Sequence, residues 1–212
     1  MKTEDLIRVL VIDSLRPIAP LEGSLLRGAL SGATLAVILF LVMLHARADL
    51  SQALGSPAFL YKLIVAASLA VTAGSLLSAM ARPLPICGHR RGWLMVAPAL
   101  LATGVVVELF TQPSGLWLSR LLGHNAAHCL SLIPLLAAGP VVCLFLALRR
   151  GAPARPASAG AIVGLASGGV GAMLYGLTCP DDSPLFVATW YTLAIASVTG
   201  ASAYAGRRLL RW

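Results

Sequence analysis

Six long apolar segments dominate this sequence and restrict what it can fold into. Each has about 18 residues or more, which is enough to cross the roughly 30 Å hydrocarbon core of a bilayer as an α-helix. A helix is expected because it satisfies every backbone hydrogen bond within its own segment, and lipid offers no other partner. The segments are approximately 28–45, 59–81, 92–111, 130–148, 158–178 and 185–206.

The composition also favours a membrane protein. The chain has 212 residues, of which 58% are hydrophobic and 11% are charged, and its mean hydropathy is +0.85. A soluble domain carries roughly 25% charged residues. We therefore predict an all-α fold, an integral membrane six-helix bundle over 28–206, with a short cytoplasmic N-terminal helix in 1–27 and a basic cytoplasmic tail at 207–212.

The basic residues predict the orientation of the chain. The net charge is +8, but the arginines form short clusters between the apolar segments and make no basic face of the kind that binds DNA. Most of them flank one side of the membrane, whereas Arg47, Lys62 and Arg120 fall on the other. Basic residues accumulate on the cytoplasmic side. Both termini are therefore expected in the cytoplasm, and no direct contact with nucleic acid is expected.

The N-terminal segment contains a predicted helix from about Glu4 to Leu15. Thr3 can cap its N-terminus, acidic residues fill the first turn, and Pro17 lies just beyond its end. Its apolar side chains fall on two arcs rather than on one stripe: Leu6, Val9 and Leu10 form one, and Ile7, Val11 and Leu15 form the other. Such a helix either binds a protein partner on two sides or lies flat on the bilayer.

The short polar turn between the last two apolar segments holds the strongest candidate for chemistry. It contains Cys179, Pro180, Asp181, Asp182 and Pro184. Two prolines allow a tight reversal, because each ring fixes its own φ and restricts the residue before it. The reversal does not need a cysteine, so we expect the function of this membrane domain to centre on the Cys179 thiol.

The predicted topology assigns the four cysteines to different parts of the protein. Cys87 falls in a cytoplasmic loop, and Cys143 falls in the inner half of the fourth segment, where it is most simply a core residue. Cys129 lies at the outer end of that segment, about 21 Å along the helix from Cys143. Two thiols, Cys129 and Cys179, therefore reach the outer face from different helices. The absence of a CxxC motif excludes a thioredoxin-type site or a zinc ribbon.

Three further residues near that outer face are candidate site residues. His124 and His128 have an i, i+4 spacing that would place both on one side of a helix and permit metal chelation, although such a pair commonly has no role. Glu108 is an acid at membrane depth, where it either has a function or extends to the interface. We treat Glu108 as the one ionisable exception within the spans.

With these features together, the chain resembles the NrsF family over essentially its whole length. The most specific match is Cys179-Pro-Asp-Asp-Ser-Pro184 running into Phe186 and Trp190, with support from Cys129, the six segments and the Met-Lys-Thr-Glu-Asp-Leu-Ile start. Members of this family are bacterial inner-membrane anti-sigma factors that hold an extracytoplasmic-function sigma factor. They respond to heavy metals or oxidants such as cadmium and chromate.

The resemblance implies roles for individual residues. Cys129 and Cys179 match the outward-facing sensor thiols, and they are expected to approach closely enough for a disulfide, with Cα atoms about 4.4–6.8 Å apart. Residues expected to support the sensor or a metal are His124, His128, Asp181, Asp182 and Glu108. Residues expected to bind the sigma factor are Asp5, Leu6, Val9, Leu10 and Asp13. The HxxxCxxC motif of soluble zinc-binding anti-sigma domains is absent, so no zinc fold is implied.

The resemblance also implies a multi-pass inner-membrane regulator rather than an enzyme. Its expected partners are the sigma factor and membrane lipid, with homo-oligomerisation left open. No resident cofactor is expected, although a heavy-metal ion could bind transiently at Cys129 and Cys179. Two alternatives are a membrane thiol–disulfide oxidoreductase, which needs a second exchangeable thiol pair and usually a quinone site, and a soft-metal transporter, which needs ionisable groups at mid-membrane.

Overall fold

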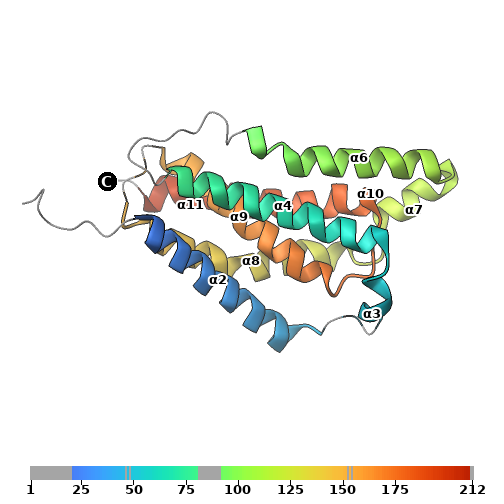
Figure 1. The fold of residues 1–212 in the computed structure, drawn as a ribbon, viewed down its shortest axis with the longest axis horizontal. Coiled ribbons are helices and arrows are strands. Elements are labelled where there is room, and N and C mark those ends of the chain that lie inside the picture. The colour runs from blue at the N-terminus through green and yellow to red at the C-terminus, as the bar shows by residue number, and fades with distance from the viewer. Residues whose placement is uncertain are drawn as a thin grey trace, which may run out of the picture.

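The computed structural model describes residues 21–45, 47, 49–80, 92–151, 153 and 155–210. Within this part of the chain every regular element is helical, as predicted. The helices lie side by side in an elongated bundle (Figure 1). The predicted N-terminal helix and the sigma-binding residues Asp5, Leu6, Val9, Leu10 and Asp13 lie outside the described residues.

Five helical segments are long and apolar enough to cross a membrane. They are α2 (Leu21–Met43), α4 (Pro57–Met80), α8 (Ala126–Leu148), α9 (Pro156–Gly176) and the continuous stretch Pro184–Leu209. The prediction of six spans is therefore confirmed for five. The remaining segment forms α6 (Val96–Thr111), whose 16 residues extend about 24 Å and fall short of a 30 Å core.

Short helices close the bundle at one end. They are α3 (Leu50–Ala53), the 3-10 turn η1 (Ser114–Leu116) and α7 (Trp117–Leu122). This end, which also includes the 177–183 turn and the start of α8, is called the cysteine end below. The described chain begins at Leu21 and finishes at Leu210 at the opposite end (Figure 1).

Helix α2 begins before the predicted boundary of the membrane domain. The sequence places that boundary at Gly28, but the helix already starts at Leu21 and includes Glu22 and Arg27. No proline lies between Leu21 and Gly28, and Arg27 Nε donates to the carbonyl oxygen of Gly23 at 3.1 Å. The helix therefore continues through the predicted boundary, because neither two charged residues nor single glycines, which cost about 1 kcal/mol each in a helix, are enough to end it.

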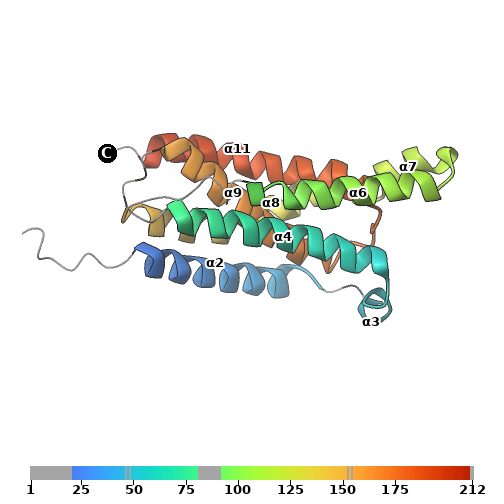
Figure 2. The same cartoon turned by 45° about the horizontal axis from the view of Figure 1, so that its top comes forward.

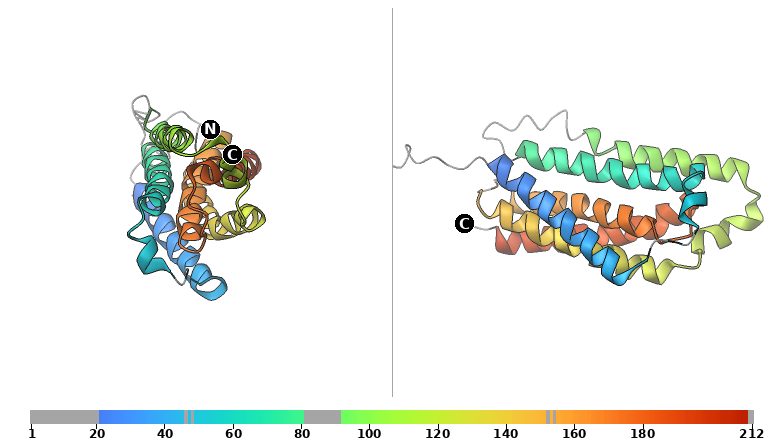
Figure 3. Two further views of the ribbon diagram at one scale, coloured as in Figure 1. Left: turned by 90° about the vertical axis from the view of Figure 1, so that its right-hand side faces the viewer. Right: turned by 60° about the horizontal axis from the view of Figure 1, so that its bottom comes forward.

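Helix α9 is the centre of the bundle. It packs against α11 (Thr192–Leu209), α4 and α8, and the views in Figures 2 and 3 place it among these neighbours. Its glycines allow backbone contact: a Cβ on Gly160 would lie 2.3 Å from the carbonyl oxygen of Ser202, and one on Gly169 would lie 2.8 Å from the backbone nitrogen of Ala70. The small residues of α9 therefore pack within this chain on two sides.

Helix α8 packs against both α9 and α2. It contains Pro134 and Pro140 in its interior. Neither ring nitrogen can donate a hydrogen bond, so the carbonyl groups of Leu130 and Leu136 lose their usual i+4 partners. Helix α2 approaches α8 closely at Pro140, because a Cβ on Gly32 would lie 2.6 Å from its Cα.

The last membrane segment consists of three consecutive helical pieces. It starts as α10 (Pro184–Phe186), passes through the π-helical turn η2 (Val187–Tyr191) and continues as α11. A π-turn inserts one extra residue and changes the direction of the side chains that follow, and such turns occur frequently at functional sites. Here it places Tyr191 in the core beside Tyr175 and Phe186, with ring centroids 5.8 Å and 6.2 Å apart.

Candidate functional site

The 177–183 turn links the end of α9 to the start of α10 at the cysteine end. The backbone nitrogen of Cys179 donates to the carbonyl oxygen of Tyr175 at 3.0 Å, which extends the helical hydrogen bonding by one turn. The turn also contacts the segment after α2, where Arg47 N donates to Leu177 O at 3.2 Å and Thr178 Oγ1 donates to His45 O at 3.1 Å. The turn is therefore held to two different parts of the bundle.

The structure brings the two candidate sensor thiols into one apolar cluster. Cys129 is 0% exposed and Cys179 is 1% exposed, and both pack with Tyr175, Phe186 and Tyr191. Both are free thiols, as is Cys143, whereas Cys87 lies outside the described residues. An approach within disulfide distance stays a prediction. What is established is that a reagent must displace part of this cluster to reach either sulfur.

Asp181 connects the turn to the start of the helix that carries Cys129. One carboxylate oxygen accepts hydrogen bonds from the backbone nitrogen of His124 at 3.1 Å and from the backbone nitrogen and side-chain amide of Asn125, both at 3.0 Å. Asn125 is the residue that precedes α8. Negative charge at this position satisfies unpaired N–H groups and interacts favourably with the helix dipole. Asp181 therefore fixes the Cys179 turn against the first turn of α8.

Asp182 lies in a second, basic environment. Its carboxylate is 2.5 Å from Lys62 Nζ and 3.0 Å from an Arg47 guanidinium nitrogen. The Lys62 ammonium, on a side chain that is 1% exposed, also donates to the carbonyl oxygen of Cys179 at 2.9 Å. A buried ammonium needs such partners, because an isolated charge in an apolar interior is very costly. The two adjacent aspartates thus anchor the turn to opposite sides of the bundle.

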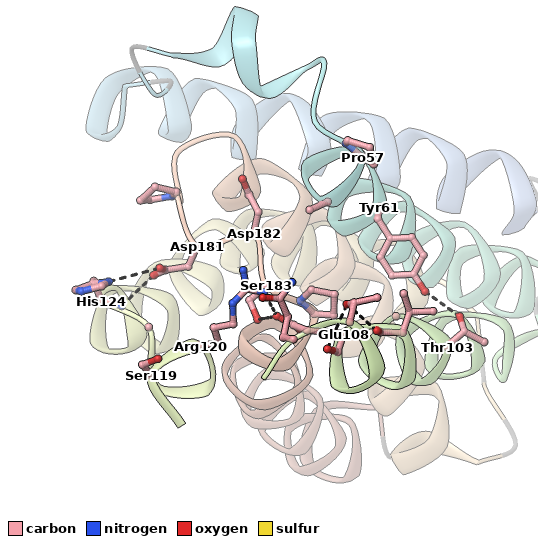
Figure 4. Close-up of a pocket in the computed structure, with 18 residues that line it drawn as sticks. Pro57, Tyr61, Thr103, Glu108, Ser119, Arg120, His124, Asp181, Asp182 and Ser183 are labelled. Atoms are coloured by element: carbon pink, nitrogen blue, oxygen red, sulfur yellow. Dashed lines mark hydrogen bonds and ion pairs between the residues drawn. The ribbon is translucent and has the colours of Figure 1, made fainter. Parts of the chain in front are cut away.

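Glu108 is buried and fully engaged rather than extended to the interface. One of its oxygens accepts from Arg120 at 2.5 Å and from Ser183 Oγ at 2.7 Å, and the other accepts from the backbone nitrogen of Leu185 at 2.8 Å. It therefore caps the N-terminus of the last membrane segment and connects it to α6 and α7. Glu108, Arg120 and Ser183 line an open pocket of about 730 Å³ at the cysteine end (Figure 4).

The histidines do not form the predicted helical pair. His124 precedes α8, which begins at Ala126, so it is not one helical turn from His128 on a shared face. Its side chain is 95% exposed, and its Nδ1 lies 3.9 Å from Asp181. Gly123, with φ of 54°, turns the chain just before it. Among the described residues no group of three or more His, Cys, Asp or Glu side chains is arranged to hold a metal ion.

The electrostatic environment affects two titratable groups at the cysteine end, Cys179 and Asp49, in opposite directions. Burial raises the pKa of the Cys179 thiol, and the nearby Lys62 charge opposes this effect only in part. The hydrogen bond from Arg47 lowers the pKa of the exposed Asp49 carboxyl. The Cys179 thiol is therefore mostly protonated at neutral pH, so it reacts slowly until it is exposed or approached by a metal ion.

Lys62 is the main site residue that the sequence interpretation missed. It lies inside a predicted span, so treating Glu108 as the one ionisable exception within the spans was wrong. An ionisable residue in such a segment is itself a functional signal. Lys62 is in the second turn of α4, near the cysteine end, and the partners at Asp182 and Cys179 account for its charge there. Tyr191 was also missed, because no local pattern marks a π-turn.

Comparison with known proteins places this site in a family. The family model described as "Negative regulator of sigma F" matches residues 14–212. The chain is 37% identical to an anti-sigma-F factor NrsF of Caulobacter vibrioides and 31% identical to a probable anti-sigma-F factor NrsF of Azospira oryzae, with all of each chain covered in both comparisons. No solved structure matches the chain significantly. The chain, with its two buried thiols and five membrane-length helices, belongs to the NrsF family.

Proposed function

We propose that this protein is a bacterial inner-membrane anti-sigma factor that binds an extracytoplasmic-function sigma factor through its N-terminal segment. In this proposal Cys129 and Cys179 face the periplasm and control release. Family membership supports a sigma factor as the partner. The observation that carries the sensor assignment is the burial of both free thiols in one cluster at the cysteine end.

The arrangement of the bundle supports signalling along its length. The described chain begins at Leu21 at the end opposite the thiols (Figure 1), and the 21 residues of α9 extend about 30 Å between the two ends. A sigma factor bound at the N-terminal segment is thus too far away to touch either thiol. Release therefore requires a second packing of the helices, favoured by the modified thiols.

Either class of inducer can act on the same thiol pair. An oxidant takes two electrons and two protons from Cys129 and Cys179 and leaves a disulfide. A soft divalent metal ion such as cadmium instead displaces both thiol protons and binds two thiolates. Since both sulfurs are buried, each reaction needs the 177–183 turn to open. Reaction and conformational change are therefore coupled.

Release of a sigma factor from the purified complex tests both parts of this proposal. The full-length protein in nanodiscs is loaded with the sigma factor and treated with cadmium or diamide, and the released sigma factor is measured. We expect release from the unmodified protein and from Cys143→Ser, the matched control, but not from Cys129→Ser or Cys179→Ser. Failure to bind any sigma factor contradicts the anti-sigma assignment, whereas binding with release that ignores both cysteines contradicts only the sensor assignment.

A further inference from the structure

The bundle contains an apolar cavity that is separate from the open pocket at the cysteine end. Helices α4, α6, α9 and α11 enclose about 540 Å³, which lies within the size range of sites for small organic molecules. Its walls are mainly aliphatic and include Leu69, Leu101, Leu165 and Ile195. A molecule that fills this space must have an apolar body.

The cavity opens sideways from the bundle. Thr192, Ala196 and Gly200 all line it and are also exposed on the surface of α11. These residues belong to a helix long and apolar enough to cross the membrane. A ligand can therefore enter from the hydrocarbon region of the bilayer without passing through water.

Two residues with polar side-chain groups, Lys62 and Tyr191, line the mainly apolar cavity. A Cβ on Gly176 would lie 3.6 Å from Lys62 Cε and 3.9 Å from Tyr191 Oη, so both side chains meet in one corner. Tyr191 is 2% exposed; its hydroxyl makes no hydrogen bond of normal geometry with a described residue, and the Cys179 thiol beside it is only a weak acceptor. A buried hydroxyl without a partner is costly, which favours a ligand that offers an acceptor.

The charges near this corner favour a neutral head group. Lys62 and Arg47 carry two positive charges, and Asp182 and Asp49, which pair with them, carry two negative charges. An additional carboxylate would leave one negative charge without a partner in an apolar environment. A ketone or quinone carbonyl accepts a hydrogen bond without that cost.

We propose that this cavity binds a lipophilic molecule with a neutral carbonyl head, the chemistry of a membrane quinone. The Tyr191 hydroxyl donates to the carbonyl, and the apolar body lies between α6 and α11. Because Tyr191 also packs in the cluster that holds Cys129 and Cys179, an occupied cavity changes the surroundings of the thiols. This binding site goes beyond the proposed function, since nothing in it depends on a sigma factor.

Two pairs of variants distinguish binding in this cavity from general contact with lipid. Gly200→Leu adds bulk at the edge of the cavity, where a Cβ would have no atom within 4 Å, and Gly23→Leu on α2 is the matched control with the same property. Tyr191→Phe removes the hydroxyl donor and keeps the ring. Tyr175→Phe is its control, since the Tyr175 hydroxyl donates to the carbonyl oxygen of Asn125 at 3.4 Å and does not line the cavity.

The test is photo-crosslinking of an azido-quinone with a decyl tail to the full-length protein in nanodiscs, with adducts mapped by mass spectrometry. We expect adducts on α4, α6 and α11 around the cavity, prevented by decylubiquinone but not by decanoic acid, which has an alkyl tail of similar length and an anionic head. Gly200→Leu should abolish labelling, and Tyr191→Phe should raise the half-saturating concentration roughly two- to tenfold, the effect of one hydrogen bond. Both controls should label normally.

Three results would overturn the proposal. The first is labelling spread over the lipid-facing surface of the bundle with no enrichment at the cavity. The second is equal labelling of Gly200→Leu and Gly23→Leu. The third is competition by decanoic acid at least as effective as competition by decylubiquinone, which would assign the cavity to acyl chains or fatty acids.

Discussion

Lys62 on α4 donates a hydrogen bond of 2.9 Å to the backbone carbonyl of Cys179, although 117 positions separate the two residues in the chain. The same ammonium lies 2.5 Å from Asp182. The Lys62 side chain therefore holds both Cys179 and the acid three positions after it. If the turn moves at Cys179, the contact with Lys62 must either break or move with the turn.

Removal of the Lys62 charge should destabilise the protein strongly. Lys62→Met leaves Asp182 partly buried with Arg47 as its remaining cationic partner, and loss of one member of a buried pair costs about 3–5 kcal/mol. The partial exposure of Asp182 and its contact with Arg47 place the expected loss at the lower end. Thermal unfolding in detergent measures it. The double variant Lys62→Met/Asp182→Leu should recover part of the loss, and purely additive effects would contradict the coupling.

Removal of the Asp181 carboxylate should expose Cys129. Asp181→Ala deletes the acceptor for three N–H groups at the start of α8, at a cost of about 1–2 kcal/mol. Because Cys129 N donates to the Asn125 carbonyl at 2.9 Å in that turn, its alkylation by a maleimide should accelerate. Asp49→Ala is the control, since its carboxylate is half exposed and contacts only Arg47 among the described ion pairs. Equal alkylation rates in both variants would contradict the capping role.

The raised pKa of Cys179 predicts a loss of stability at alkaline pH. A thiol that is harder to ionise when folded stabilises the native state at neutral pH, and this contribution falls once the pH exceeds the ordinary thiol pKa of about 8.5. Denaturation between pH 8 and 10 should therefore show a steeper decline for the unmodified protein than for Cys179→Ala, by up to about 1.4 kcal/mol per pH unit. Parallel curves would show that Cys179 does not contribute.

Apolar residues ahead of the described chain should carry the affinity for the sigma factor. Burial of a leucine side chain contributes about 1.5–3 kcal/mol, so Leu6→Asp or Leu10→Asp should weaken the complex by more than tenfold. Surface plasmon resonance with the protein in nanodiscs measures this change. Deletion of residues 1–20 leaves every described helix in the chain and should abolish binding. Undiminished affinity after that deletion would place the sigma-binding surface elsewhere.

The sequence predicted those features that depend on local composition. Long apolar runs predicted an all-helical membrane domain, and the cysteine positions at helix ends predicted that two thiols would share one end of the bundle. Asp181 and Asp182 necessarily lie near Cys179, because adjacent positions in a tight turn cannot separate far, but their predicted support of a sensor or metal stays a prediction. These predictions needed only helix length and the direction of the chain.

The features that the sequence did not predict depend on contacts between distant segments. The pairing of Lys62 with Asp182 joins residues 120 positions apart, and no periodicity in either segment indicates the partner. The position of His124 outside α8 follows from Gly123 and from the Asp181 cap, which arises in another loop. The length of α6 likewise differs from the length of its apolar run, because residues 92–95 are not part of that helix.

The two interior prolines of α8 give the thiols unequal supports. Cys179 follows α9, whose glycines allow its backbone to pack closely against its neighbours. Cys129 is on α8, in which the carbonyl groups of Leu130 and Leu136 lack their helical hydrogen bonds. The free-energy cost of bending a helix is lowest where such backbone hydrogen bonds are absent. Strain from bringing the two sulfur atoms together would therefore be relieved by bending of α8 near its middle. The tightly packed α9 would bend less.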